Sequence, residues 1–568
     1  MSFCAPVAEA ATVPTPGKVP LQCPVDGWGN GLETGSHQRS LLALAFRESG
    51  YGRLGGAVAG GKNILIFSDG TGQAGGYMPD EARSNVYKLF RATRISPDAA
   101  IDPKKQIAFY DGGLGSRAGG EGIKFKWWRR AYNFLGKATG LGITQNIIDC
   151  YAEIIRVWKP GDRIYLFGFS RGAYTVRCVG GVLKHCGIPT AVRQGSRVML
   201  LKRDPKSARR IAAEAVKYVY QYGSSIKGDP YRAERHARAA RFRAKYFSGD
   251  EQTSNTAPYF IGAWDTVGAL GAGWFWLCAG AASYAGLAGL MALALALALG
   301  PQLLLPSFLA LALGLPVAIY LGACLRYKGF LSLARYRMAF YDTELVYAVR
   351  YARHALSIDE NRRQFECVPW DDEQSKRSGA EEAATPPRFK QMWFAGSHSD
   401  VGGSYQETES RLSDIALAWM VEEAERLPHP ICVDRSVLKL YPDAAGGQHN
   451  ERKAAITACP RWLVRLALQF VDQRTFLWRE GYRSIPPDAE LHPTVLERFA
   501  LSGVLMHDQI RPYRPPALRN HWAVRGYWSP GNRANGGIAA ARRPIPRIQA
   551  RPSTAAQGRK HWWSMRAR

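Results

Sequence analysis

The sequence predicts an α/β fold, in which a mostly parallel β-sheet carries helices on both faces. Two observations lead to this prediction. Short runs of apolar β-branched and aromatic residues, at 64–67 and 164–167, are typical of strands buried on both faces. The segment 144–158 between them places apolar side chains three or four positions apart, as an amphipathic helix does. Strand, helix and strand in alternation indicate a parallel sheet with crossover helices.

The composition excludes several classes of protein. Of the 568 residues 46% are apolar, which is ample for a large core. The ten cysteines are scattered without a C-x-x-C pair, which argues against a disulfide framework or a zinc site. We expect no metal and no cofactor. The first 35 residues lack a basic region followed by an apolar core, so no secretory signal peptide is expected.

The net charge of +28 is concentrated near the C-terminus. Residues 509–568 hold 13 Lys or Arg and no Asp or Glu. A tail of this kind, rich in Pro and Gly, is expected to be solvated, and the alternative is a surface that binds an anionic partner. The chain has no recognisable nucleic-acid-binding motif, so we expect no nucleic-acid partner.

The second apolar run leads into the pattern G-x-S-x-G, formed by Gly168-Phe169-Ser170-Arg171-Gly172. A helix is predicted to follow over 173–183. Strand, tight turn and helix form the nucleophile elbow of an α/β-hydrolase-like sheet, in which Ser170 is the nucleophile. The Arg171 N–H, at the start of the helix, is then a candidate donor to an oxyanion.

The first apolar run leads into a sharp loop, Asp69-Gly70-Thr71-Gly72. In an α/β-hydrolase sheet, a loop after an early strand supplies the second oxyanion-hole N–H, for which Gly70 and Thr71 are the candidates. The alternative is that Asp69 caps a turn, as Asp before Gly commonly does.

The remaining elements follow from the same patterns. Residues 191–244 are strongly basic and mostly helical in pattern, which suggests a cap or surface insertion. The other predicted elements are helices at 84–93, 343–358 and 412–427, strands at 106–110, 259–264 and 389–396, and a loop at 397–404.

A serine hydroxyl needs a base within hydrogen-bond reach, and the base needs an orienting carboxylate. The expected chain order is serine, acid, histidine, which Asp265 and His398 satisfy after predicted strands. Asp400 is an alternative acid, and His354 and His492 are alternative bases.

No charged residue and no histidine occurs from Thr266 to Leu325. Gly300-Pro301 divides this stretch into 274–299 and 303–325, each long enough for the ~20 residues of a bilayer-spanning helix. We expect a helical hairpin in the membrane. The alternatives are a buried helical pair and a lid-like hairpin that inserts only on contact with lipid.

These features divide the chain into five parts. The expected parts are a loosely ordered leader (1–60), the first half of the hydrolase domain (61–265), the apolar hairpin (266–326), the second half of the domain (327–508) and the basic tail (509–568).

Six blocks between residues 63 and 499 resemble a bacterial and fungal family of α/β-hydrolase domains of unknown function. This family includes the catalytic domain of type VI secretion phospholipase effectors. The blocks lie at 69–71, at 140–173 around Ser170, and at 264–268, 354–360, 398–403 and 491–498.

The resemblance implies a serine esterase of the phospholipase A type that acts on phospholipids, with Ser170, Asp265 and His398 as nucleophile, acid and base. Together with the apolar hairpin it implies a membrane-associated protein. The partners that it implies are a phospholipid membrane, secretion-apparatus proteins and immunity proteins. The route that it implies is type VI secretion into a target cell. The rival hypotheses are a membrane-anchored general carboxylesterase or thioesterase, and a non-catalytic scaffold on a hydrolase fold.

Overall fold

The computed structural model describes residues 61–528, apart from ten gaps. The leader, Thr71, the hairpin beyond Gly314 and most of the basic tail lie outside the described residues. The gaps are 71–81, 98–99, 113–140, 223–229, 269–272, 315–344, 346–347, 364, 371–385 and 454–477.

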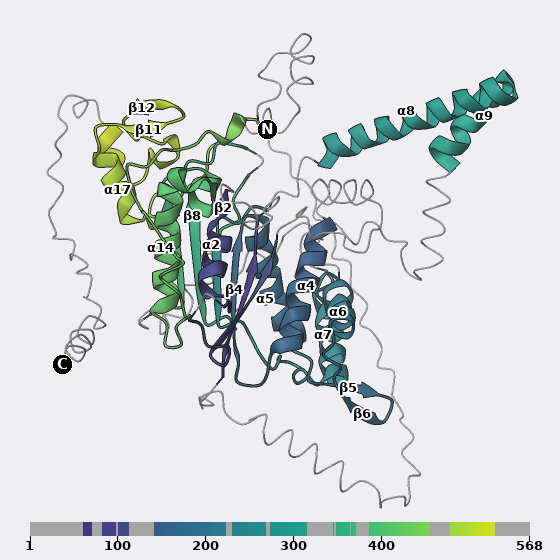
Figure 1. Cartoon of the computed structure of the whole chain (residues 1–568), viewed down its shortest axis with the longest axis horizontal. Coiled ribbons are helices and arrows are strands. Elements are labelled where there is room, and N and C mark those ends of the chain that lie inside the picture. Colours follow the sequence, from purple (N-terminus) through teal and green to yellow (C-terminus); the bar gives the residue numbers. More distant parts are fainter. Residues whose placement is uncertain are drawn as a thin grey trace, which may run out of the picture. The chain divides into compact units, whose positions relative to one another are not determined.

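Parallel strands form a central sheet with helices around it (Figure 1). The sheet has six strands, in the order β3-β1-β4-β7-β8-β9. The predicted α/β class is thus confirmed. The strand that leads to Ser170, β4, lies between β1 and β7. The bounds are β1 (Asn63–Ser68), β3 (Gln106–Asp111), β4 (Arg163–Phe169), β7 (Phe260–Trp264), β8 (Tyr351–Ser357) and β9 (Phe389–Phe394).

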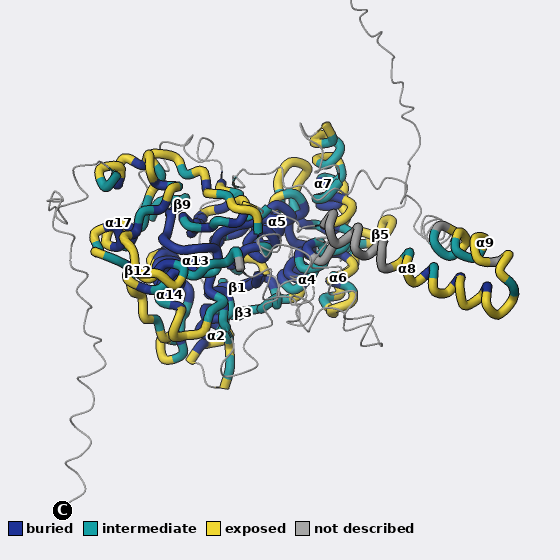
Figure 2. Tube along the Cα trace, turned by 90° about the horizontal axis from the view of Figure 1, so that it is seen from above, coloured by how far each residue is buried: buried dark blue, intermediate teal, exposed yellow. Residues whose placement is uncertain are grey.

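Helices cover both faces of the sheet because alternate residues of each strand enter two different cores. Ile64 and Ile66 of β1 pack with α4, α5, α6 and α7, whereas Leu65 and Phe67 pack with α2 and α14. In Figure 2 the middle of the molecule around β1 has the dark blue of buried residues, and every residue of β1 and of β7 is buried. The bounds are α2 (Asn85–Thr93), α4 (Leu141–Val157), α5 (Arg171–Cys186), α6 (Pro205–Glu214), α7 (Arg232–Tyr246) and α14 (Arg411–Glu425).

The basic segment 191–244 is mostly helical, as expected, but it opens with a β-hairpin. The hairpin joins β5 (Ala191–Gln194) to β6 (Arg197–Leu200). A π-helical stretch, Ala215–Tyr220, extends α6 toward α7.

Two sequence predictions on the C-terminal side of the sheet are wrong. The helix predicted over 343–358 is not found in the described residues of that range, since β8 occupies Tyr351–Ser357 and all seven of its residues are buried. Its polar residues Arg353 and His354 interrupt the apolar run that marks β1 and β4, and their partners come from distant segments. The predicted loop at 397–404 contains one helical turn, α13 (His398–Gly402), and the short strand β10 (Gly403–Tyr405), which pairs with β2 (Arg83–Ser84).

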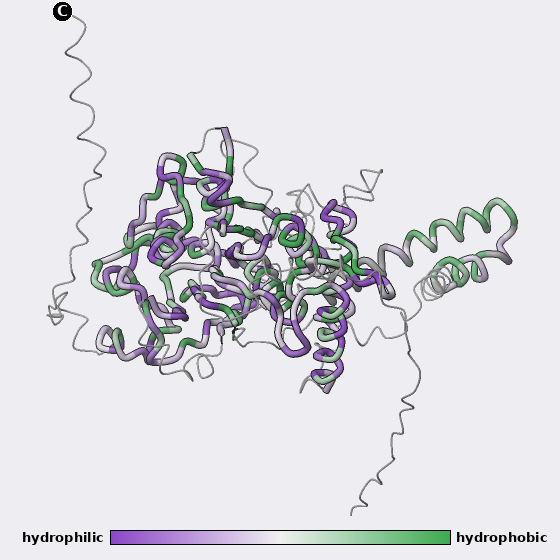
Figure 3. Tube along the Cα trace, turned by 90° about the horizontal axis from the view of Figure 1, so that it is seen from below, coloured by the Kyte–Doolittle hydropathy of each residue, from purple (hydrophilic) through white to green (hydrophobic). Residues whose placement is uncertain are grey.

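The apolar segment after Asp265 forms α8 (Gly273–Leu299), which Figure 3 shows in the colour of hydrophobic residues. Gly300 has a φ of 121°, and the chain then breaks into the 3₁₀ turn Pro301–Leu303, α9 (Leu304–Leu309) and the π turn Ala310–Gly314. Ala288, Ala292 and Ala296, spaced four apart, are buried, and most described leucines of α8 are exposed.

In the part of the chain that the structure describes, no helix combines the length and the apolar character needed to cross a membrane. The two membrane-spanning helices expected over 274–299 and 303–325 are therefore not found there. Pro301 is the first residue of the 3₁₀ turn and Pro306 lies in the first turn of α9, so neither proline interrupts the interior of an α-helix.

The folded domain extends beyond residue 508, where the basic tail was expected to begin. Tyr513, Leu518 and Val524 are buried in a third core with Val495 and Phe499. The elements here are α17 (Pro493–Ala500), β11 (Val504–Met506), β12 (Gln509–Arg511) and the 3₁₀ turns Pro516–Leu518 and Arg525–Trp528, and two further 3₁₀ turns lie at Glu407–Glu409 and Glu451–Lys453.

Candidate active site

Ser170 lies at the sharp turn between β4 and α5. Its φ of 58° and ψ of −120° form a combination that residues with a side chain rarely adopt. Its backbone N–H donates to the Trp264 carbonyl oxygen at the end of β7, 3.0 Å away. The serine therefore stands at the carboxyl edge of the sheet, where open α/β sheets build their sites.

Two glycines allow the close packing around this turn. A Cβ atom at Gly168 would lie 2.4 Å from the Gly172 carbonyl oxygen. A Cβ atom at Gly172 would lie 2.0 Å from the carbonyl oxygen of Ser68, the last residue of β1. The two glycines of the G-x-S-x-G pattern are thus required by the contact of α5 with β4 and β1.

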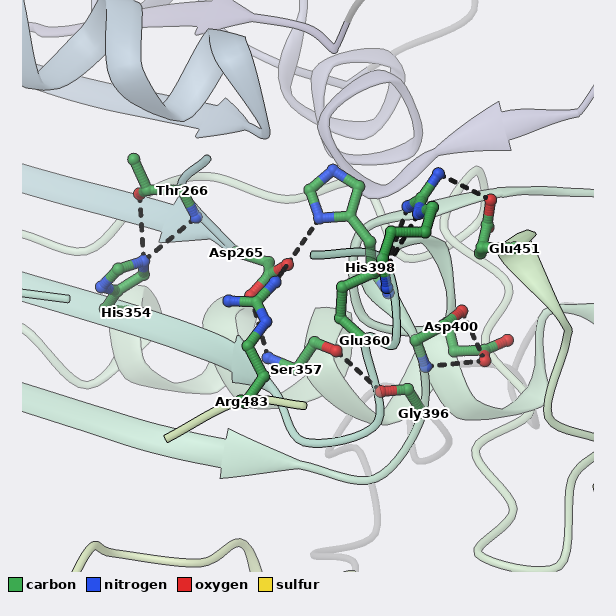
Figure 4. A network of polar contacts seen from close by, with 12 residues as sticks. Asp265, Thr266, His354, Ser357, Glu360, Gly396, His398, Asp400, Glu451 and Arg483 are labelled. Carbon is green, nitrogen blue, oxygen red and sulfur yellow. Dashed lines mark hydrogen bonds and ion pairs between the residues drawn. The ribbon is translucent and has the colours of Figure 1, made fainter. Parts of the chain in front are cut away.

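Asp265 follows β7 directly and is fully buried. Its Oδ1 accepts the Ser357 N–H at 3.0 Å, and its Oδ2 lies 2.5 Å from Nδ1 of His398 (Figure 4). Burial by itself would raise the pKa of Asp265, but the charge of Arg483 and the hydrogen bond from His398 outweigh it and lower the pKa to about 2. The carboxylate is therefore ionised and able to orient the imidazole.

His398 is the first residue of α13 and is 4% exposed. Its backbone N–H donates to Oε2 of Glu360, 3.1 Å away. Its ring centroid lies 4.6 Å from that of Phe169 and 5.5 Å from that of Phe365. Because Phe169 immediately precedes Ser170, the histidine ring and the serine share a neighbour.

Arg483 is the residue of this site that the sequence analysis missed. Its Nη2 lies 2.8 Å from Asp265 Oδ2, and its side chain is 4% exposed. It comes from a stretch without regular structure, 218 positions after Asp265. No local pattern marks such a residue, and the only available signal was an arginine in an otherwise unassigned segment.

The proposed oxyanion loop lies beside the serine. A Cβ atom at Gly70 would lie 3.6 Å from Ser170 Cβ, but the Gly70 N–H donates to Oδ1 of Asp69 at 2.7 Å. Oδ2 of Asp69 accepts the hydroxyls of Ser84 and Tyr110, at 2.5 and 2.7 Å, so this carboxyl group anchors the loop. Burial raises the pKa of Asp69 to about 6, although these three hydrogen bonds act to lower it.

The other predicted donor on this side, Thr71, lies outside the described residues. Arg171 begins α5, so its backbone N–H belongs to the first turn of that helix. Burial lowers the pKa of its guanidinium to about 10.

The alternative acid, Asp400, pairs with a different histidine. Its Oδ1 lies 2.7 Å from Nδ1 of His449, and its Oδ2 accepts the N–H and the hydroxyl of Ser397, each at 2.9 Å. Asp400 therefore caps the helix that begins with His398, and Asp265 is the carboxylate that contacts the His398 ring.

Neither alternative base contacts Asp265. His354 is buried, with Nε2 3.0 Å from Thr266 Oγ1 and Nδ1 3.1 Å from Gln391 Oε1, and burial lowers its pKa to about 3. His492 caps α17 through Thr494, and burial lowers its pKa to about 4. Both rings hold structural positions.

Among the described residues there is no group of three or more His, Cys, Asp or Glu side chains arranged to hold a metal ion.

A parallel sheet with a strained serine after its central strand, and a buried His–Asp pair at the same edge, define the α/β-hydrolase-like class. Residues 62–423, more than half of the chain, match the family model described as type VI secretion system phospholipase effector Tle1-like, catalytic domain. The chain belongs to this family.

Three individual proteins are also similar over parts of the chain. An uncharacterized protein of Saccharomyces cerevisiae, YEL023C, is 31% identical over 133 residues, which are 22% of this chain and 18% of that protein.

The other two are solved structures. The match to an uncharacterized protein from Pseudomonas aeruginosa covers 72% of this chain and 51% of that protein's chain, with 15% sequence identity and a TM-score of 0.29. The match to a Tle1 effector bound to the VgrG spike of the type VI secretion system covers 62% of this chain and 52% of the effector's chain, with 14% sequence identity and a TM-score of 0.25. The chain spans about half of each structure, and the family assignment rests on the family model alone.

Proposed function

We propose that the protein is a serine hydrolase that cleaves carboxylic esters of membrane phospholipids, with Ser170 as nucleophile, His398 as base and Asp265 as orienting acid. The observation that carries this proposal is the 2.5 Å contact between His398 Nδ1 and Asp265 Oδ2, at the sheet edge that holds Ser170. The family description supports the phospholipid as substrate.

The reaction proceeds in two halves. Ser170 Oγ attacks the ester carbonyl carbon, and its proton passes to His398 Nε2. The tetrahedral intermediate collapses, the C–O bond to the alcohol breaks, and His398 gives its proton to the leaving lysolipid. Water then attacks the acyl-enzyme, gives a proton to His398, and the fatty acid leaves as Ser170 regains its hydrogen.

The N-terminal turn of α5 is the proposed donor to the oxyanion, through the N–H of Arg171. A second N–H from Gly70 or Thr71 completes the proposed hole. Because the Gly70 N–H is held by the Asp69 carboxyl group, its use requires that this hydrogen bond be exchanged for one to the substrate.

The apolar side chains of α8 and α9 favour a lipid over a small soluble ester as substrate. Leu290 and Leu297 are 67% and 81% exposed, and clustered apolar side chains at a surface mark contact sites for lipid or protein. In this proposal they contact the acyl chains of the substrate.

Membership of the family further supports delivery into a target cell by a type VI secretion apparatus. An immunity protein that blocks the enzyme in the producing cell is part of the same proposal. If the enzyme attacks membranes, its expression is toxic, and Ser170→Ala abolishes the toxicity.

The decisive experiment measures fatty-acid release from anionic phospholipid vesicles and, in parallel, hydrolysis of a short nitrophenyl ester. Ser170→Ala is expected to abolish both activities, whereas Ser436→Ala, an exposed serine in a turn, retains them. Short-ester hydrolysis without vesicle hydrolysis would make the protein a general esterase. Failure of the wild type on both substrates would leave the scaffold hypothesis.

A further inference from the structure

The Asp265 carboxylate has two partners on the same oxygen. Oδ2 lies 2.5 Å from His398 Nδ1 and 2.8 Å from Arg483 Nη2 (Figure 4). Asp265 is 0% exposed and Arg483 4%, so little water reaches either charge. A buried carboxylate of this kind is stable as an ion only if a buried cation compensates it.

Arg483 is held in place by main-chain contacts of its own segment. The Arg363 N–H donates to the Arg479 carbonyl oxygen at 2.9 Å, and the Gly481 N–H donates to the Asn361 carbonyl oxygen at 3.0 Å. A Cβ atom at Gly481 would lie 3.0 Å from Arg363 Cα, so the two segments touch. The guanidinium is thus directed at Asp265 by backbone that packs beside Glu360.

A second buried ion pair lies on the other side of His398. Glu360 Oε1 is 2.7 Å from Arg362 Nε, and Glu360 Oε2 accepts the His398 N–H. The histidine therefore stands between two carboxylates, each of which has its own arginine. Among the described residues, the other titratable or charged groups around this cluster include Cys367, His354, Arg177, Glu451 and Tyr405.

The formal charges of the two ion pairs cancel. Without Arg483 the cluster would carry one uncompensated negative charge next to the imidazole, and a negative neighbour favours the protonated ring. A protonated ring cannot accept the serine proton.

We propose that Arg483 is a positioning residue of the active site, which holds Asp265 ionised and oriented and keeps His398 in the neutral form that a base requires. The inference rests on the proposed function, because it assigns His398 the role of base.

The first test compares Arg483→Met, which removes the charge at similar length, with Arg483→Lys, which keeps it. In short-ester hydrolysis, Arg483→Met is expected to lower kcat/KM at least ~10-fold and to move the acidic limb of the pH profile upward by about one pH unit. Arg483→Lys is expected to lower the rate but to leave the limb in place. The matched control is Arg353→Met, which removes a buried arginine that pairs with Glu423 of α14. The acidic limb of its pH profile is expected to stay at the wild-type position.

The second test asks whether Arg483 acts through Asp265. The double variant Asp265→Asn/Arg483→Met has no uncompensated charge, so it folds even if Arg483→Met alone does not. If Arg483 acts through Asp265, the double variant is no slower than Asp265→Asn. If the double variant instead loses the product of the two single-variant losses in activity, Arg483 does not act through Asp265 and the inference is overturned.

A third measurement needs no activity. In ¹⁵N-histidine NMR of the Ser170→Ala protein, with His398→Gln to assign the signal, loss of the charge is expected to move the His398 titration to higher pH. An unchanged titration overturns the role of Arg483, whatever the enzyme hydrolyses. A shifted titration in a protein that hydrolyses neither ester overturns only the proposed function.

Discussion

Nδ1 of His449 lies 2.7 Å from Oδ1 of Asp400, so the carboxylate two residues after the proposed base belongs to another histidine. The ring of His449 stacks on Tyr405, with 3.7 Å between the centroids. This pair ties the loop at 449 to the helical turn that carries His398.

The first prediction concerns the pH dependence of stability. Burial lowers the pKa of His449, but the hydrogen bond to Asp400 and the charges of Asp400, Glu409 and Glu451 outweigh it, and the pKa is raised. A raised folded pKa contributes stability that is fully present below the unfolded pKa of ~6.5 and is lost as the pH rises through the folded pKa.

His449→Gln is therefore expected to lower the free energy of unfolding by about 1 kcal/mol at pH 5.5 and by much less at pH 9. Chemical denaturation at both pH values measures the difference. Equal losses at pH 5.5 and pH 9 would contradict a charged pair.

The second prediction tests the assignment of Asp265. Asp265→Asn removes the charge that orients His398 and is expected to lower kcat by about 10³- to 10⁴-fold in short-ester hydrolysis. His492→Asn keeps a helix-capping residue at a histidine away from Asp265, so its activity stays close to that of the wild type. A large loss of kcat in His492→Asn, or a small loss of kcat in Asp265→Asn, would contradict the assignment of Asp265 as the orienting acid.

The third prediction concerns the packing of the nucleophile turn. In Gly172→Ala the new methyl group meets the Ser68 carbonyl oxygen at 2.0 Å, so α5 must move away from β1. We expect a loss of about 3 kcal/mol or more in the free energy of unfolding. Gly286→Ala in α8 meets nothing within 4 Å and is expected to be neutral or slightly stabilising by thermal denaturation.

The fourth prediction concerns Asp69, whose pKa burial raises to about 6. The unfolded chain releases this proton near pH 4, before the folded protein does, so the folded state loses stability as the pH rises from about 4 to about 6. Asp69→Asn removes this loss. Urea unfolding measures the free energy of unfolding of the variant minus that of the wild type. This difference is expected to be larger at pH 7 than at pH 4 by up to about 3 kcal/mol. A difference independent of pH would show that the pKa of Asp69 is the same in the folded and the unfolded chain.

The fifth prediction separates lipid contact from chemistry. Leu290→Ser/Leu297→Ser changes two exposed side chains of α8 and is expected to reduce vesicle hydrolysis several-fold, with short-ester hydrolysis unchanged. Leu200→Ser, which changes a 90% exposed leucine of β6, serves as the control. Equal vesicle hydrolysis by all three proteins would remove α8 from the substrate contact.

The sequence predicted the fold well where local signals are strong. Strands β1 and β4 are continuous apolar runs, and Ser170 stands between two glycines that only a tight strand–helix turn requires. Strand β8 was mistaken for a helix because Arg353 and His354 lie in its middle. The partners that make their burial possible, Glu423 and Gln391, come from α14 and β9.

The predicted site shows the same limit. Ser170, Asp265 and His398 follow strands, so their common sheet edge could be inferred. Asp400 could not be separated from Asp265 by spacing, because its partner His449 is 49 positions away. Arg483 lies farther still from its carboxylate, in a stretch that has no periodicity.

The wide separation of the site residues also affects when the site can exist. A ribosome makes the N-terminal part of a chain first, and a domain generally folds as a unit. Ser170 is made long before His398, and Arg483 comes last. A nascent chain that ends before residue 398 therefore contains the nucleophile without its base, and the complete proposed site does not exist until synthesis has passed residue 483.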